Sequence, residues 1–127
     1  MKIINKKILV TGGAGFIGSN LCYELARRGN HVLILDDLST GRMENIEPIV
    51  GEKVSFVYGS VVEKSLLHRL FYKVDFVFHL AAINGVPNSL QNPLATHQAN
   101  VNGTLNVLLA ARAVSYTHLT LPTILLV

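Results

Sequence analysis

The sequence predicts an α/β protein, a doubly wound parallel sheet that is incomplete in this chain. Three observations predict it. Short apolar runs rich in β-branched residues alternate with segments of helical spacing, a glycine-rich turn follows the first run, and an acidic residue ends the second. Alternation of this kind is typical of an open parallel sheet whose strands are joined by crossover helices.

A first strand is predicted at Lys7–Thr11, where a β-rich run stops at two glycines. The apolar residues that follow recur with helical spacing and are Phe16, Ile17, Leu21 and Leu25. This helix should end before Gly29, since glycine suits the position just past a helix C-terminus. His31–Leu35 is a continuous apolar run, as expected of a parallel strand covered on both faces.

Residues 37–51 are predicted to form a loop with one helical turn. Further strands are predicted at Val54–Tyr58 and Asp75–Leu80, with a helix at Val61–Phe71 between them. After a turn-rich stretch, apolar spacing predicts a long helix that ends near Arg112. Its stripe consists of Leu94, His97, Val101, Leu105, Leu108 and Leu109.

Composition excludes several classes of protein. With 127 residues, 50% hydrophobic and 15% charged, the chain suits one folded domain rather than a disordered tail. Its net charge of +3 is scattered, which argues against a nucleic-acid partner. Cys22 is the only cysteine, so no internal disulfide can form. No apolar run approaches the ~18–20 residues of a membrane span, and we expect a cytoplasmic protein without a membrane partner.

The glycine-rich turn, "VTGGAGFIGS", satisfies two spacings of phosphate-binding loops. Gly13, Gly15 and Gly18 fit G-x-G-x-x-G, and Gly12, Gly15 and Gly18 fit G-x-x-G-x-x-G. A strand precedes the motif and a helix follows it, which is the context of a Rossmann-type dinucleotide site. Early glycines allow a tight turn under a pyrophosphate, and the last allows close packing of helix on strand. The free N–H groups and the helix dipole attract phosphate charge.

Asp36 ends the second strand, 18 residues after Gly18. This is near the ~20 expected for the acid that bonds the adenosine ribose hydroxyls. A strand-ending Asp can also simply start a turn. Taken with the glycines, Asp36 favours NAD over NADP, because its carboxylate would repel a 2′-phosphate. Arg42 is a nearby cation that leaves NADP open as a minor option.

The chain resembles the extended short-chain dehydrogenase/reductases, specifically the NAD-dependent epimerase/dehydratase family. "TGGAGFIGS", "DDLSTG", "FHLAA" and "NVNGTLNVLLAAR" match family blocks in their usual order over nearly all of residues 1–113. The stretches "DDLSTG" and "NGVPNSLQNPLATHQANVNGTLNVL" most resemble UDP-sugar 4-epimerases, including those that act on UDP-glucose or UDP-N-acetylglucosamine for surface polysaccharides. NAD is the cofactor that the resemblance implies.

The resemblance also implies which residues contact NAD. The pyrophosphate would lie on Gly12, Gly15, Phe16, Ile17 and Gly18. The adenosine ribose would be surrounded by Asp36, Asp37, Ser39 and Gly41. The cofactor would be lined after the fourth strand by Leu80, Ala81 and Ala82, with Asn100 near the nicotinamide end. Small residues at strand ends also pack closely, and an Asn on a helix can simply bond a loop carbonyl.

Two positions depart from the family pattern. Ser60, followed by Val61, stands near the adenine where the family usually has an Asp. The loop that usually reads S-V-P-R-S carries Gly85 and Asn88 here, which weakens the substrate assignment. His79 lies within a family block, but no acid or cysteine stands at metal spacing from it. We therefore interpret it as a satisfied strand histidine and expect no metal site.

Family chemistry comes from a Tyr and a Lys four residues apart on one helix, where the ammonium lowers the tyrosine pKa. The four tyrosines of this chain are Tyr23, Tyr58, Tyr72 and Tyr116. The residues four positions later are Arg27, Val62, Phe76 and Thr120. The chain thus contains no such dyad, and we expect no catalytic residue in it.

Residues 114–127 contain no Lys, Arg, Asp or Glu. "VSYTHLTLPT" resembles the in-frame translation of a transposon-end sequencing adapter. We therefore expect residues 1–113 to be the NAD-binding Rossmann portion and 114–127 a non-native tail. A naturally divergent short C-terminus is the alternative.

The sequence thus predicts the N-terminal NAD-binding fragment of a UDP-sugar 4-epimerase, inactive alone. A full-length form would bind a nucleotide sugar and form a homodimer. Two alternatives stay open: a sugar-nucleotide dehydratase or reductase of the same family, and a non-catalytic dinucleotide-binding protein.

Overall fold

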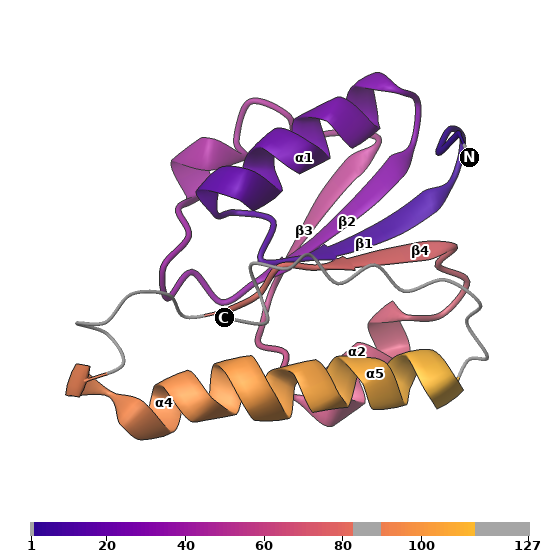
Figure 1. Cartoon of the computed structure of the whole chain (residues 1–127). Helices are drawn as coiled ribbons and strands as arrows, with labels where there is room; N and C mark the ends of the chain where they lie inside the picture. Colours follow the sequence, from indigo (N-terminus) through magenta and orange to yellow (C-terminus); the bar gives the residue numbers. More distant parts are fainter. Residues whose placement is uncertain (1, 83–89, 114–127) are drawn as a thin grey trace.

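The computed structural model describes residues 2–82 and 90–113. Its centre is a four-stranded parallel sheet in the order β3-β2-β1-β4 (Figure 1). The strands are β1 (Lys7–Thr11), β2 (His31–Asp36), β3 (Val54–Tyr58) and β4 (Phe76–His79). The predicted α/β fold with a parallel sheet is confirmed. β4 is one residue shorter at each end than predicted.

Alternation along the strands gives the sheet two buried faces. Leu9 on β1 pairs with Leu33 on β2 and with Val77 on β4, in register on both sides. Ile8 and Val10 are fully buried toward the opposite face. Because every second side chain points to the same face, one apolar strand supplies both halves of the core.

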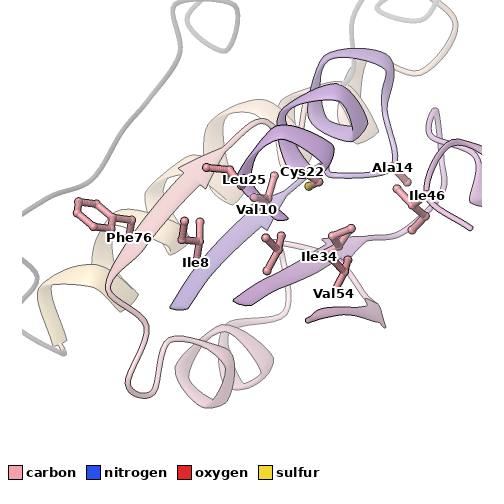
Figure 2. Packing of buried hydrophobic residues seen from close by; sticks show 10 residues of the cluster. Ile8, Val10, Ala14, Cys22, Leu25, Ile34, Ile46, Val54 and Phe76 are labelled. Carbon is pink, nitrogen blue, oxygen red and sulfur yellow. The ribbon is translucent and has the colours of Figure 1, made fainter. Parts of the chain in front are cut away.

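Helices cover both faces, as in a doubly wound sheet (Figure 1). One face carries α1 (Phe16–Arg27) and the short helix η1 (Met43–Asn45); the other carries α2 (Lys64–Leu70) and α5 (Gly103–Ala113). α5 continues α4 (Pro93–His97) through η2 (Gln98–Asn102), a π-helical turn. Figure 2 shows the cluster under α1, in which Cys22 and Leu25 pack on Ile8, Val10 and Ile34.

Two predictions about helices need correction. The helix predicted at Val61–Phe71 spans only Lys64–Leu70, because the residues before it form a turn. The predicted stripe of the long helix is not its sheet-facing side: Leu94 and Leu105 are 69% and 52% exposed. The sheet side of α5 is instead made of small or polar residues and one valine: Gly103, Asn106, Val107, Ala110 and Ala111. Small side chains let the helix approach the sheet closely, a signal that apolar spacing does not capture.

Within the described residues, no helix is both long and apolar enough to cross a membrane. The predicted boundary after residue 113 and the tail 114–127 lie outside the described residues. The substituted loop positions Gly85 and Asn88 lie outside them as well.

Candidate functional site

The carboxyl ends of the strands open into a cleft of about 330 Å³. β2 and β3 are added on one side of β1, and β4 is added on the other side. The cleft lies at this switch in strand order. Such switch points are the usual ligand sites of open parallel sheets, because the loops that follow neighbouring strands separate there.

The cleft gathers most of the residues that the sequence singled out. Those that line it are Gly12, Gly15, Phe16, Ile17, Gly18, Asp36, Asp37, Ser39, Ser60, Val61, Leu80, Ala81 and Ala82. Gly41 and Asn100 do not line it. Sequence reasoning did not single out four further lining residues: Leu35, Thr40, Gly59 and Ala99. Ala99 precedes Asn100 in the π-helical turn, so the helix itself reaches the cleft there.

The glycine turn packs the end of β1 against the first residues after β4. Gly12 has a φ of +73°, and a Cβ there would lie 2.7 Å from the Ala81 nitrogen. Gly18 is tighter still, because a Cβ would lie 2.2 Å from the Gly12 carbonyl oxygen. Gly15 differs: its nearest neighbour would be the same oxygen at 3.4 Å. Gly12 and Gly18 therefore serve packing, whereas Gly15 keeps the rim of the cleft open.

The N-terminus of α1 points its amides at this rim. The Ser19 amide bonds the Gly15 carbonyl oxygen at 2.9 Å, which closes the first helical turn. The backbone amides of Phe16, Ile17 and Gly18 come before Ser19, in the first turn of the helix. The amides of a first helical turn have no acceptor within the helix. No side chain caps α1 in the part of the chain that the structure describes. These amides and the helix dipole make the rim a place for an anion.

The Asp36 side chain bonds both the glycine turn and the loop that follows β2. Its Oδ2 accepts from the Ala14 amide at 2.9 Å, and its Oδ1 accepts from the Leu38 amide at 2.8 Å. The residue is 8% exposed, and burial raises the pKa of its carboxyl above the usual range. Leu38 holds a left-handed backbone with a φ of 60°, which the bond to Asp36 helps to stabilise. The carboxylate thus orders the glycine turn as well as facing the cleft.

A residue that sequence reasoning missed also holds the glycine turn. The Ala14 carbonyl oxygen accepts from the Asn45 side-chain nitrogen at 2.8 Å and from the Arg42 amide at 3.1 Å. A Cβ at Gly41 would lie 2.9 Å from Asp36 Oδ2, so Gly41 supports that carboxylate from behind. The Arg42 side chain does not line the cleft. Asn45 is the last residue of the short helix η1, a segment without regular apolar spacing, so no pattern in the sequence indicated it.

The opposite wall of the cleft comes from the turn after β3. The Ser60 amide donates to Glu63 Oε2 at 2.7 Å, and the Val62 amide donates to the Ser60 hydroxyl oxygen at 3.2 Å. This Ser-x-x-Glu turn resembles the capping box that precedes many helices, and α2 follows it at once. Position 60 holds a serine where the family resemblance implies an acid. A nearby acid, Glu63, bonds the Ser60 amide and orders the turn.

His79 is the centre of a buried hydrogen-bond chain. Thr11 Oγ1 accepts from the Leu80 and Ala81 amides at 3.0 and 3.2 Å and lies 2.6 Å from His79 Nδ1. His79 Nε2 lies 3.0 Å from Thr104 Oγ1, whose hydroxyl donates to the Asn100 carbonyl oxygen at 2.8 Å. These bonds fix the tautomer: Thr11 donates to Nδ1, and Nε2–H donates to Thr104. His79 is satisfied on both sides, as the sequence indicated.

The buried imidazole should make stability depend on pH. Burial lowers the pKa of His79 from 6.5 to about 4. Between these values the unfolded chain binds more protons than the folded chain, so the free energy of unfolding falls as the pH falls. We expect a loss of about 3 kcal/mol from pH 6.5 to 4, measured by urea unfolding. His79→Asn should remove this part of the slope, whereas substitution of exposed His68 by Gln should leave it. An unchanged slope in His79→Asn would contradict the assignment.

No group of three or more His, Cys, Asp or Glu side chains among the described residues could hold a metal ion. The acids of the cleft, Asp36 and Asp37, stand together at the end of β2, and Asp37 Oδ1 is bonded to the Ser39 amide and hydroxyl. The cleft therefore offers helix amides at one place and carboxylates at another, an arrangement suited to a phosphate next to a sugar's hydroxyl groups.

Comparison with known proteins gives a consistent set of relatives. The sequence model of the GDP-mannose 4,6 dehydratase family matches residues 9–121. A UDP-N-acetyl-alpha-D-glucosaminuronate decarboxylase of Bacillus cytotoxicus is 40% identical over 108 residues, which are 85% of this chain and 33% of the decarboxylase. This chain spans about a third or less of the length of the curated relatives it matches.

Solved structures share the fold closely. An epimerase from Methanothermobacter thermautotrophicus superposes with a TM-score of 0.87 at 40% identity, covering 94% of this chain and 35% of the epimerase. The UDP-glucose 4-epimerase of Thermus thermophilus, solved as a complex with NAD, gives a TM-score of 0.78 at 37% identity, covering 89% of this chain and 36% of that enzyme. The part that matches is in each case a minority of a longer protein.

Proposed function

This chain belongs to the NAD-dependent epimerase/dehydratase family, and from this premise we propose that its cleft binds NAD as the cofactor-binding part of a nucleotide-sugar enzyme. The observation that carries the proposal is the cleft itself. It joins the free amides of α1 to the buried carboxylate of Asp36 across a glycine turn that has no room for side chains at Gly12 and Gly18.

The residues present fit the dinucleotide in three places. The amides that open α1 would hold the pyrophosphate, next to the open face of Gly15. Asp36 keeps lone pairs on both carboxylate oxygens after bonding Ala14 and Leu38, and these would accept the ribose hydroxyls. Ser60 and Val61 would face the adenine. NAD supplies a reversible hydride acceptor, while this chain's residues bind and orient it.

We propose that the reaction of the whole enzyme is epimerisation at C4 of a UDP-sugar. A 4-epimerase of similar structure, solved with NAD, supports this proposal. Decarboxylation of a UDP-sugar acid is the second candidate, supported by the relative of Bacillus cytotoxicus at 40% identity. Both reactions would use the same cofactor cleft. A homodimeric full-length form and a cytoplasmic location stay predictions.

Asp36 should set the preference for NAD. We expect Asp36→Ala to weaken NAD binding by about 1–3 kcal/mol, because a charge-assisted hydrogen bond to the ribose is lost. NADP should bind the parent more weakly than NAD and gain relative to it in the variant, since the carboxylate no longer faces the 2′-phosphate. Titration calorimetry with both dinucleotides measures the two effects.

The matched control for this experiment is Glu44→Ala, which removes an exposed acid from η1 without touching the cleft. It should leave the affinities for NAD and NADP unchanged. If Asp36→Ala bound NAD as tightly as the parent does, Asp36 would not be the ribose ligand. If the parent bound neither dinucleotide, the proposed function itself would be wrong.

A further inference from the structure

The cleft wall at Ser60 and Val61 is held from behind by α5. Asn106, on that helix, donates from its side-chain nitrogen to the Val61 carbonyl oxygen at 3.1 Å. Asn106 is 7% exposed and does not line the cleft. Its amide is therefore placed on the wall's backbone rather than on any ligand.

The peptide that Asn106 contacts is bonded at both ends. Its carbonyl group belongs to Val61 and its N–H to Val62, and that N–H donates to the Ser60 hydroxyl oxygen at 3.2 Å. One peptide plane thus connects Asn106 to Ser60. Because the hydroxyl oxygen accepts from Val62, the hydroxyl hydrogen is directed elsewhere, and it can donate to a ligand in the cleft.

Two further contacts restrict the same segment. Glu63 Oε2 accepts from the Ser60 amide at 2.7 Å, which fixes the backbone on the other side of Ser60. On α5, a Cβ at Gly103 would lie 2.4 Å from Val61 Cγ2, so the helix lies directly against the Val61 side chain. Ser60 therefore has little freedom to turn unless the Val61 peptide turns with it.

We propose that Asn106 is a positioning residue that acts through the Val61–Val62 peptide to hold the Ser60 hydroxyl against the adenine ring, an inference that rests on the proposed binding of NAD. A nitrogen of the purine ring is an acceptor that a hydroxyl donor matches.

A double-mutant cycle tests the connection. Affinities for NAD and for AMP, the adenine half, are measured by NMR titration of the 127-residue chain in four forms: the parent, Ser60→Ala, Asn106→Ala and the double variant. We expect Asn106→Ala to weaken both ligands roughly 3- to 10-fold in the parent, the range for one lost hydrogen bond. In the Ser60→Ala background the same substitution should change affinity by less than about 2-fold.

Asn102→Ala is the matched control, because Asn102 is an exposed asparagine on the same helical run; it should bind both ligands as the parent does. A purely structural role for Asn106 predicts the same loss in both backgrounds, and that result would overturn the proposal. If Asn106→Ala does not fold, the isosteric Asn106→Asp replaces it, and failure of both to fold would also overturn a positioning role. A parent that binds neither NAD nor AMP would overturn the proposed function and this inference with it.

Discussion

Gly18→Ala should destabilise the chain by about 3 kcal/mol or more and abolish NAD binding. A Cβ at this position would lie 2.2 Å from the Gly12 carbonyl oxygen and 2.8 Å from Gly13 Cα. Both are backbone atoms of the turn, so no side chain can rotate to make room. The turn or the first part of α1 must shift, and the amides proposed to hold the pyrophosphate shift with it.

Helix propensity alone predicts that Gly18→Ala increases the stability of the chain. The sign of the measured change therefore shows which effect is larger. Gly18 lies inside α1, where Ala is favoured over Gly by about 1 kcal/mol. The clash should outweigh that gain, because a contact of 2.2 Å is far inside any van der Waals separation. In a domain of this size, a loss of 3 kcal/mol should lower the Tm by roughly 10–20 °C in a thermal melt.

Gly51→Ala is the control for the same chemical change. No heavy atom lies within 4 Å of a Cβ built there, and the residue is exposed. Its stability and its NAD affinity should stay within about 0.5 kcal/mol of the parent's. Equal melting temperatures for Gly18→Ala and the parent would mean that the turn adapts, and the packing account of the glycine motif would be wrong.

The elements that position the cleft could be predicted from the sequence because their signals are local. Lys7–Thr11 and Val54–Tyr58 are found at the predicted residues, since a β-rich run that stops at glycine or polar residues leaves few other structures. The glycines and Asp36 meet in one cleft because parallel strands place their carboxyl ends at one edge. Spacing and topology therefore go far toward predicting the site.

The residues that hold the cleft could not be predicted in the same way. Asn45 and Asn106 bond backbone carbonyl groups 31 and 45 residues distant in the chain. Neither bond leaves a periodic signal, because an asparagine on a helix or in a loop is usually exposed. The buried face of α5 was missed for a related reason: Gly103 and Ala110 pack closely on the strands, while the larger Leu105 faces outward.

The 127-residue chain itself should show no UDP-sugar turnover with NAD. Tyr23, Tyr58 and Tyr72 are 59%, 70% and 64% exposed, and none of them lines the cleft. Tyr116, the remaining tyrosine, has a threonine rather than a lysine four residues on. The ionisable residues that do line the cleft in the described part of the chain, Asp36 and Asp37, are the ones proposed to face the ribose of NAD. Among residues 2–82 and 90–113, no group is therefore placed to take a proton from a sugar hydroxyl.

The expected loss of UDP-sugar turnover has two causes, the absence of a general base and the absence of residues that position the sugar. Absence of a general base costs about 10²–10⁴ in rate. Absence of residues that hold the sugar against the cofactor costs more, because positioning can supply about 7–11 kcal/mol of the barrier. A longer chain of this family that adds a Tyr-x-x-x-Lys helix to the same cleft should be active, since it restores both contributions.

The assay incubates the purified chain with NAD and either UDP-glucose or UDP-N-acetylglucosamine and measures the 4-epimer by chromatography. Gly18→Ala, prepared in parallel, separates activity of this cleft from that of a contaminating enzyme, because only the former depends on the glycine turn. Epimer formed by the parent and absent from the variant would overturn the expectation of inactivity. It would also require that the cleft contain an acid–base group other than tyrosine. Asp37, which lines the cleft next to Asp36, would be the first residue to substitute.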